Sequence, residues 1–164
     1  MWLFDRKNLL GGLALAALSL TACGFEPVYG PDGVGTRLQG RIALTAPETH
    51  NSYLFNRHFE TRMGRSVNAP MQLAVTLDTD ETDMGGTSTG NTTRYRVSGT
   101  ATYTLVADKT QLSAGTTDAF TGYSNTGSTV ATIAARRDAY ARLMVILADQ
   151  VIDELLLAAP DVPE

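Results

Sequence analysis

Apolar and polar side chains alternate along several stretches of the chain, which is typical of strands that bury one face. The alternation predicts four strands, over residues 37–44, 71–80, 94–105 and 116–124. It is clearest in the third stretch, where every even position is polar. It is weakest in the fourth, which favours an edge position in a sheet.

Residue types that break regular structure lie between these stretches. Ala46-Pro47 ends the first predicted strand, and Asp108-Lys109 starts a turn after the third. Residues 84–93 are rich in glycine, serine and threonine, and this composition predicts a loop.

Two stretches have a helical period instead. Residues 48–63 predict an amphipathic helix that Thr49 or Asn51 can cap and that Gly64 can end. A longer helix is predicted from Ser128 or Thr129 to Pro160. The apolar stripe of the first helix is Phe55, Phe59 and Met63, and that of the second is Ile133, Tyr140, Leu143, Met144, Leu147, Val151 and Leu155.

The order of these elements, β-α-β-β-β-α, predicts an α+β fold. We expect a four-stranded, largely antiparallel sheet with two helices packed on one face and a polar, threonine-rich face left open. This single domain should cover residues 36–160. Residues 161–164 would form a short tail, and the proline- and glycine-rich residues 23–35 a tether.

The N-terminus is typical of a bacterial lipoprotein signal. A short basic start is followed by apolar residues 9–20 and by Leu20-Thr21-Ala22-Cys23. The apolar run is too short to cross a bilayer, which needs about 20 residues. We therefore expect residues 1–22 to be removed and Cys23 to carry a diacylglycerol thioether and an amide-linked acyl chain such as palmitate. Gly24 after the cysteine favours sorting to the outer membrane.

An alternative is an ordinary secretory signal cleaved after Ala22, with Cys23 a bystander. Cys23 is the only cysteine, so the domain is expected to fold without a disulfide. The chain holds 17 acidic and 13 basic side chains, a net charge of −4. This balance argues against nucleic acid as a partner, because phosphate binding needs clustered lysine and arginine.

No catalytic or metal-binding motif is recognisable. His50 and His58 are too far apart on one helix for an i, i+4 ligand pair. The acidic cluster that starts at Asp78 lacks the glycine and glutamate of a calcium loop. The chain has no Gly-x-Ser-x-Gly elbow, and its glycine-rich loop lacks the P-loop lysine. We therefore expect a binding or structural protein without a cofactor, not an enzyme.

The remaining candidates are the arginines at polar strand positions. They are Arg37, Arg41, Arg94 and Arg96. One interpretation is cross-strand pairing with Asp78 and Asp80. The other is a small cationic surface for a phosphorylated or carboxylated partner, since arginine suits bidentate contacts with such groups.

Several segments resemble the lipopolysaccharide-assembly lipoprotein family LptE, in its alphaproteobacterial form. They are Cys23-Gly24-Phe25-Glu26-Pro27-Val28-Tyr29-Gly30, the third strand Arg94-Tyr95-Arg96-Val97-Ser98-Gly99-Thr100-Ala101-Thr102-Tyr103-Thr104-Leu105, Tyr123-Ser124, and the last helix with Asp138-Ala139, Arg142 and Leu147-Ala148-Asp149. The resemblance depends on their order and spacing over nearly the whole chain after the leader.

The resemblance implies two helices against a four-stranded sheet, in agreement with the periodicity. It also implies a plug inside the outer-membrane barrel LptD that assists assembly of the barrel and passage of lipopolysaccharide to the cell surface. The partners would then be a barrel, lipopolysaccharide and, through the lipid, the membrane. The four arginines are the candidates for contact with lipopolysaccharide or barrel.

Two other hypotheses remain open. The chain could be an accessory lipoprotein of another envelope assembly or secretion system, with the same anchor and fold but a different partner. It could also be a lipid-anchored enzyme that acts on envelope polymers, although it lacks a recognisable catalytic constellation.

Overall fold

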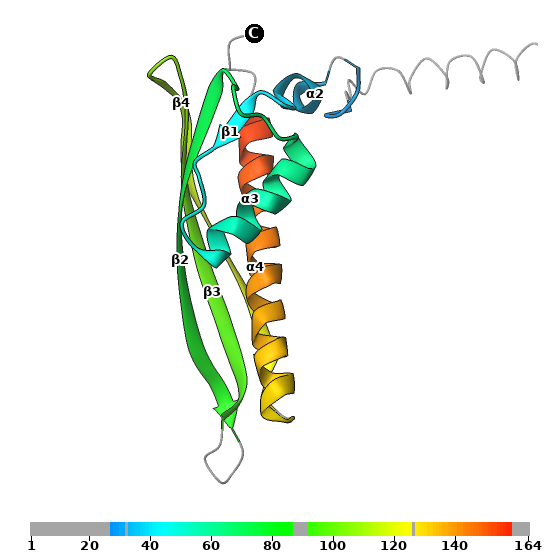
Figure 1. Ribbon diagram of the computed structural model, residues 1–164, viewed down its shortest axis with the longest axis vertical. Helices are drawn as coiled ribbons and strands as arrows, with labels where there is room; N and C mark the ends of the chain where they lie inside the picture. The colour runs from blue at the N-terminus through cyan, green and yellow to red at the C-terminus, as the bar shows by residue number, and fades with distance from the viewer. Residues whose placement is uncertain (1–26, 32, 87–91, 126, 159–164) are drawn as a thin grey trace, which may run out of the picture.

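The computed structural model describes residues 27–31, 33–86, 92–125 and 127–158 (Figure 1). The elements, in chain order, are α2 Val34–Leu38, β1 Ile42–Leu44, α3 His50–Met63, β2 Met71–Gly86, β3 Thr92–Ala107, β4 Thr110–Ser124 and α4 Thr129–Ala158. The predictions on the leader, on Cys23 and on residues 161–164 concern residues outside these ranges.

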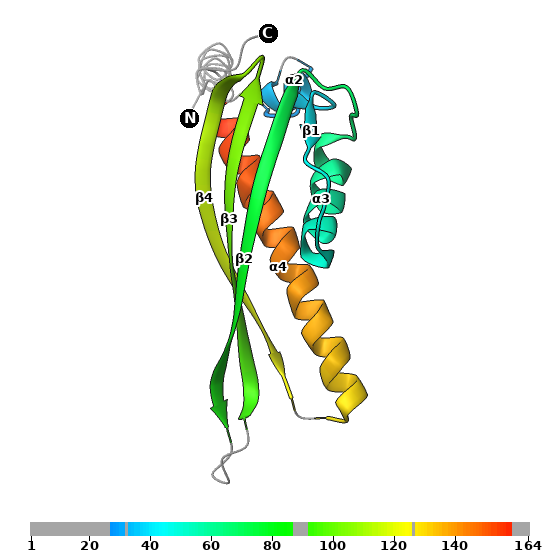
Figure 2. The same ribbon diagram turned by 60° about the vertical axis from the view of Figure 1, so that its left-hand side comes forward.

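The strands form one sheet in the order β1-β2-β3-β4. β2, β3 and β4 make a long antiparallel meander, and short β1 pairs parallel with the start of β2. Helices α3 and α4 lie on one side of the sheet, and its other side is uncovered (Figures 1 and 2). The predicted α+β fold is confirmed, with one parallel pair in an otherwise antiparallel sheet.

The core lies between the meander and α4 and includes the buried face of α3, with Phe55, Phe59 and Met63 as predicted. The predicted inner face of β3 is confirmed, because Val97, Ala101, Tyr103 and Leu105 are all buried. Gly99 belongs to the same row, and a Cβ built there would lie 2.9 Å from Leu143 Cδ2. The absence of a side chain at this position therefore lets α4 approach the strand.

The predicted first strand is wrong over its first half. Residues 34–38 form α2, and only Ile42–Leu44 are extended. Gly40 separates the two with a φ of +72°, which suits glycine, and its N–H donates to Met63 O at 2.7 Å. Leu38 and Ile42 are both buried, but they reach the core from different elements. Their shared parity was therefore coincidental.

The hairpin strands are longer than the alternation predicts. β2 continues to Gly86, so the predicted loop over residues 84–93 is too long at its start, and β3 begins at Thr92. The register shifts near Gly85, whose φ is +140°. β4 begins at Thr110, because Asp108 and Lys109 both have positive φ and form a tight turn directly before it. Its predicted edge position is confirmed.

The helix ends follow the predicted caps. Ser52 N donates to Thr49 Oγ1 at 3.1 Å and Thr49 N to Ser52 Oγ at 2.9 Å, a complete capping box at the start of α3. Gly64 follows the last residue of α3, and Ser128 Oγ accepts from Ala131 N at the start of α4. Ile133 is 47% exposed, because the buried stripe of α4 begins only at Ala139.

The hydroxyl of Thr117 is the clearest polar defect in the described core. Thr117 is only 7% exposed, and its Oγ1 has no hydrogen-bond partner. Thr121, on the same face of β4, instead donates to Ala139 O at 2.9 Å. An unpaired buried hydroxyl costs free energy that a methyl group of the same shape does not.

We expect Thr117→Val to raise the free energy of unfolding by about 1 kcal/mol. The matched change Thr121→Val should lower it by about 1 kcal/mol, because it removes a satisfied bond. Urea unfolding followed by circular dichroism measures both. Equal destabilisation by the two variants would contradict the assignment of Thr117 as unsatisfied.

Candidate functional site

Cationic and apolar side chains gather on the sheet near the end of β2 and the start of β3, where Arg94 is exposed and Arg96 is half-buried. Met84, Arg94, Arg96 and Phe120, which we call the tip surface, line one shallow depression of about 430 Å³ together with Tyr95 and Tyr123. Met84 is 56% and Phe120 61% exposed. An exposed aromatic ring of this kind, beside arginine and methionine, is typical of a binding surface.

Arg96 lies across the ring of Phe120. Its guanidinium carbon is 3.9 Å from the ring centroid. The register explains the contact, since Ser98 pairs with Phe120 and Arg96 with Gly122, so the two side chains are diagonal neighbours on adjacent strands. Stacking on an aromatic face holds a guanidinium in place while its N–H edge stays available to phosphate or carboxylate.

The other face of the same strands is held by Glu81. Its Oε2 accepts from Arg136 Nε at 2.7 Å and from Tyr140 Oη at 3.3 Å, and its Oε1 accepts from Tyr123 Oη at 2.9 Å. Arg136 and Tyr140 lie on α4, and Tyr123 on β4. One carboxylate thus ties β2 to β4 and to the first half of α4.

The electrostatics of this cluster follow from its burial and its hydrogen bonds. Burial alone would raise the pKa of Glu81, but the hydrogen bonds from Arg136 and Tyr123 outweigh it and hold the pKa below its ordinary value. Burial and the neighbouring Glu81 carboxylate raise the pKa of Tyr123 to about 12. Tyr123 therefore stays a hydrogen-bond donor at neutral pH.

Stacking extends the cluster to β3. The rings of Tyr95 and Tyr123 are 5.0 Å apart at the centroids and inclined by 10°. Because Tyr95 and Tyr123 also line the depression of the tip surface, the Glu81 cluster supports that surface from behind. Sequence reasoning missed Glu81, Tyr123, Arg136 and Tyr140 as a group, since only the strand register and the helix packing bring them together.

The four candidate arginines do not form one surface. Arg37 lies in α2, so its predicted strand position is wrong, and Arg41 lies directly before β1. Arg41 O accepts from Met71 N, and Met71 pairs with Ala107 at the far end of β3. At about 3.3 Å per residue, Ala107 lies about 35 Å from Arg96 along the strand. The structure therefore brings together Arg94 and Arg96 only.

Cross-strand pairing does not neutralise the tip arginines. Among the described residues, no ion pair joins Arg94 or Arg96 to Asp78 or Asp80. Asp80 instead accepts from Thr82 Oγ1 at 3.0 Å. Arg96 interacts with a ring and not with a carboxylate, so it keeps its capacity to bind an anion.

Neither histidine lines the tip surface: His50 lines a different depression with Arg136 and Tyr140, and His58 lies between α3 and α4. His58 Nε2 is 2.8 Å from Asp149 Oδ1, which also accepts from Arg62 at 2.7 Å, so the three side chains link α3 to α4. Within the described ranges, no three histidine, cysteine or acidic side chains are grouped to hold a metal ion. The expectation that the chain needs no metal or cofactor stays a prediction.

Comparison with known proteins finds a family match over most of the chain. The family model described as LptE, lipopolysaccharide-assembly, matches residues 39–155. No curated protein sequence matches. Within the described part of the chain, none of the helices is both long and apolar enough to span a membrane.

Solved structures share the fold at low identity. A lipoprotein structure from Caulobacter crescentus has a TM-score of 0.65 at 20% identity, over 80% of this chain and 98% of that one. Rare lipoprotein B from Shewanella oneidensis has a TM-score of 0.58 at 10% identity, over 73% and 95% of the two chains. A minor lipoprotein from Acinetobacter baumannii has a TM-score of 0.52 at 15% identity, over 71% and 88%.

We expect Glu81→Gln to lower the free energy of unfolding at pH 7 by about 1–2 kcal/mol, because it removes a charge-assisted bond. A carboxyl group with a depressed folded pKa stabilises above its unfolded pKa, and the effect disappears as pH falls through the folded pKa. The difference between wild type and variant should therefore shrink below about pH 4.

Urea unfolding at a series of pH values measures this dependence. Asp80→Asn, on the opposite face of β2, is the matched control and should have little effect. A Glu81→Gln difference that stays constant from pH 7 down to pH 3 would contradict the role of the charged carboxylate.

Proposed function

Because the chain belongs to the LptE lipopolysaccharide-assembly family, we propose that it is an outer-membrane lipoprotein that plugs the lumen of the LptD barrel. In this role it assists the assembly of the barrel and the export of lipopolysaccharide to the cell surface. It acts by fitting a partner and not by catalysis. The lipid on Cys23 anchors it to the membrane.

The observation that carries the proposal is the long meander with its uncovered polar face. β2 has 16 residues, so it is about 50 Å long at about 3.3 Å per residue. The apolar band of an outer-membrane barrel is about 25 Å tall, and the lumen is polar. The outer face of the sheet suits such a lumen, since its residues include Gln72, Thr76, Asp78, Thr100, Thr102, Thr116 and Asp118.

The first described residues and the tip surface lie at opposite ends of the molecule (Figure 1). Val28 O accepts from Gly35 N at 2.8 Å, so the first described residues lie against α2, far from the end of β2 at Gly86 and the start of β3 at Thr92. Cys23 is within about 14 Å of Pro27 along the chain. A protein anchored there can extend the meander into a barrel with the tip surface leading.

The tip surface supplies the chemistry for lipopolysaccharide. Arg94 and Arg96 offer guanidinium groups to phosphate or carboxylate, and Phe120 and Met84 offer apolar contact beside them. This combination fits a phosphorylated amphiphile. Arg37 and Arg41, at the anchor end, remain candidates for contact with the barrel or the membrane surface.

We expect affinity purification of the tagged, acylated chain in mild detergent to recover a large outer-membrane barrel. Depletion of the chain should then reduce lipopolysaccharide at the cell surface. Recovery of the chain alone would contradict the plug role. Normal surface lipopolysaccharide together with another envelope defect would favour an accessory role in a different assembly system.

We expect Arg94→Glu combined with Arg96→Glu to weaken binding of purified lipopolysaccharide about tenfold or more, as for loss of charge-assisted bonds of 1.5–3 kcal/mol. The matched pair Arg37→Glu and Arg41→Glu reverses the same number of charges at the other end and should bind nearly as the wild type does. Titration against labelled lipopolysaccharide measures both. Equal losses in the two pairs would show that only net charge matters.

A further inference from the structure

The free edge of β4 is the longest stretch of unpaired strand among the described residues. β4 pairs with β3 along its length, and no strand lies beyond it in the sheet order (Figure 2). Asn125 N donates to Thr93 O at 2.9 Å, so odd-numbered residues of this ladder bond to β3. The even-numbered residues Ala114, Thr116, Asp118 and Phe120 therefore direct their N–H and C=O groups to the free edge.

An independent contact confirms this direction. Gly122 belongs to the same even-numbered set, and its carbonyl oxygen accepts from Arg142 Nη2 of α4 at 3.1 Å. Gly122 pairs with Arg96 and therefore lies at the end of the free edge that is nearest the tip surface. From Ala114 to Phe120 no comparable side chain of the described residues bonds to the edge.

β4 lacks the features that usually protect an edge strand. Its 15 residues include one charged side chain, Asp118, and no proline or lysine. The opposite edge of the sheet is partly covered and more acidic. There β1 covers the start of β2 as far as Leu73, and Asp78, Asp80, Glu81 and Asp83 follow. Only the β4 edge is therefore open and nearly uncharged.

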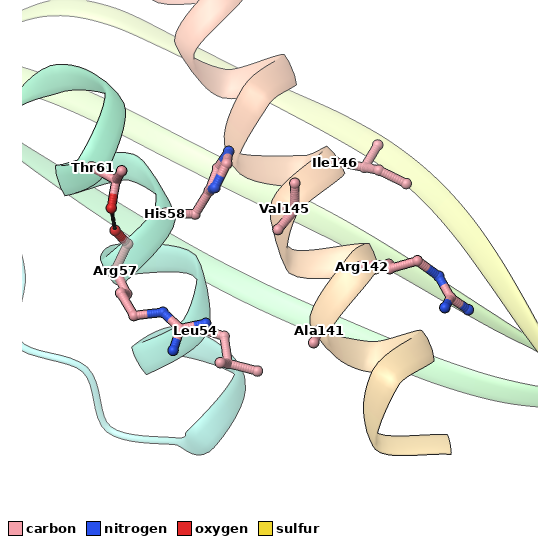
Figure 3. Close-up of a pocket in the computed structure, with 8 residues that line it drawn as sticks. All are labelled: Leu54, Arg57, His58, Thr61, Ala141, Arg142, Val145 and Ile146. Carbon is pink, nitrogen blue, oxygen red and sulfur yellow. Dashed lines mark hydrogen bonds between the residues drawn. The ribbon is translucent and has the colours of Figure 1, made fainter. Parts of the chain in front are cut away.

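Apolar side chains flank the β4 edge on both faces of the sheet. Phe120 is exposed on the outer face. On the helix side, Arg142 and Ile146 point away from α3, and Ile146 is 37% exposed (Figure 3). The bond from Arg142 to Gly122 O places this side of α4 beside β4. A strand added at the edge would have apolar surface available above and below it.

We propose that the β4 edge from Ala114 to Phe120 binds an extended segment of the partner polypeptide by strand addition. This inference rests on the proposed function, in which the partner is the barrel. A closed barrel has no free strand edge of its own, so the segment must come from a loop or another extended part of that chain. Backbone hydrogen bonds would supply the affinity, and side-chain contacts would determine the register of the added segment along β4.

Charge favours a different chain over a second copy of this one. In an antiparallel pairing of two β4 strands centred on this stretch, the two Asp118 carboxylates would lie opposite or diagonal to each other, which is unfavourable. A basic side chain on the incoming segment opposite Asp118 would instead be favourable. The occupant is therefore an uncharged or basic extended segment with an apolar residue towards Ile146.

Amide hydrogen exchange of the acylated chain, free and in its detergent-solubilised complex with the barrel, tests the proposal. The amides of Thr116, Asp118 and Phe120 should exchange much more slowly in the complex than in the free chain. The edge amides of Thr79 and Glu81 on β2 provide the comparison within the same molecule. They should show a smaller change.

Thr116→Pro gives a second test, because it removes an edge N–H without removing a bond to β3. It should lower recovery of the barrel about tenfold, as for loss of one backbone bond. Thr116→Val keeps the N–H, and Thr79→Pro alters the other edge. Both should recover the barrel as the wild type does, and thermal unfolding checks that all three variants fold.

The outcomes separate the two proposals. If the wild-type chain recovers no barrel, the plug role fails and the edge proposal fails with it. If the complex forms but the β4 amides exchange as in the free chain, only the edge proposal fails. Slow exchange of these amides in a dimer of the purified chain would overturn the edge proposal, because the occupant of the edge would then be a second copy of this chain.

Discussion

The close approach of α4 to β3 is the contact on which the rest of this structure depends. Leu143 and Leu147 lie against Gly99, where a Cβ would crowd both leucine side chains and make them shift. Each fully buried leucine contributes about 2 kcal/mol, and the buried stripe of α4 continues to Leu155. Three long antiparallel strands expose an apolar inner face, and this single helix covers most of it. The other face is then free to be polar.

The same packing produces the candidate site. Because α4 runs along β4, its first half brings Arg136 and Tyr140 to Glu81 on β2. That cluster links β2 and β4, which are not neighbours in the sheet, through Glu81 and Tyr123. The tip surface lies on the opposite face of these strands, so its arginines and Phe120 are displayed by a supported scaffold. The same strands thus pack in the core with their inner face and carry the tip surface on their outer face.

Periodicity predicted the elements and their buried faces well, because both follow from local sequence. The inner row of β3, the capping box at Thr49 and the end of α3 at Gly64 all agree with the structure. The prediction of the first strand is wrong because Gly40, with its φ of +72°, separates helix α2 from β1, and parity alone does not reveal such a break. Alternation also shows which face of the sheet a side chain lies on, but it does not show at which end of the sheet the residue lies. For this reason Arg37 and Arg41 could not be separated from Arg94 and Arg96 before the register was known.

Net charge is a poor guide to what this chain can bind, because its charges are unevenly distributed. The acidic residues Asp78 and Asp118 flank Thr100 in the middle of the outer face, and Asp80 pairs with Ser98 between them and the arginines, whereas Arg94 and Arg96 lie towards the end of β3 at Thr92. Thr100 lies four residue steps from Arg96 along the extended strand, which is about 13 Å. This exceeds the screening length of about 8 Å at physiological ionic strength. An anion at the tip surface is therefore screened from Asp78 and Asp118, whereas Asp80, a diagonal neighbour of Arg96, is close enough to oppose its attraction.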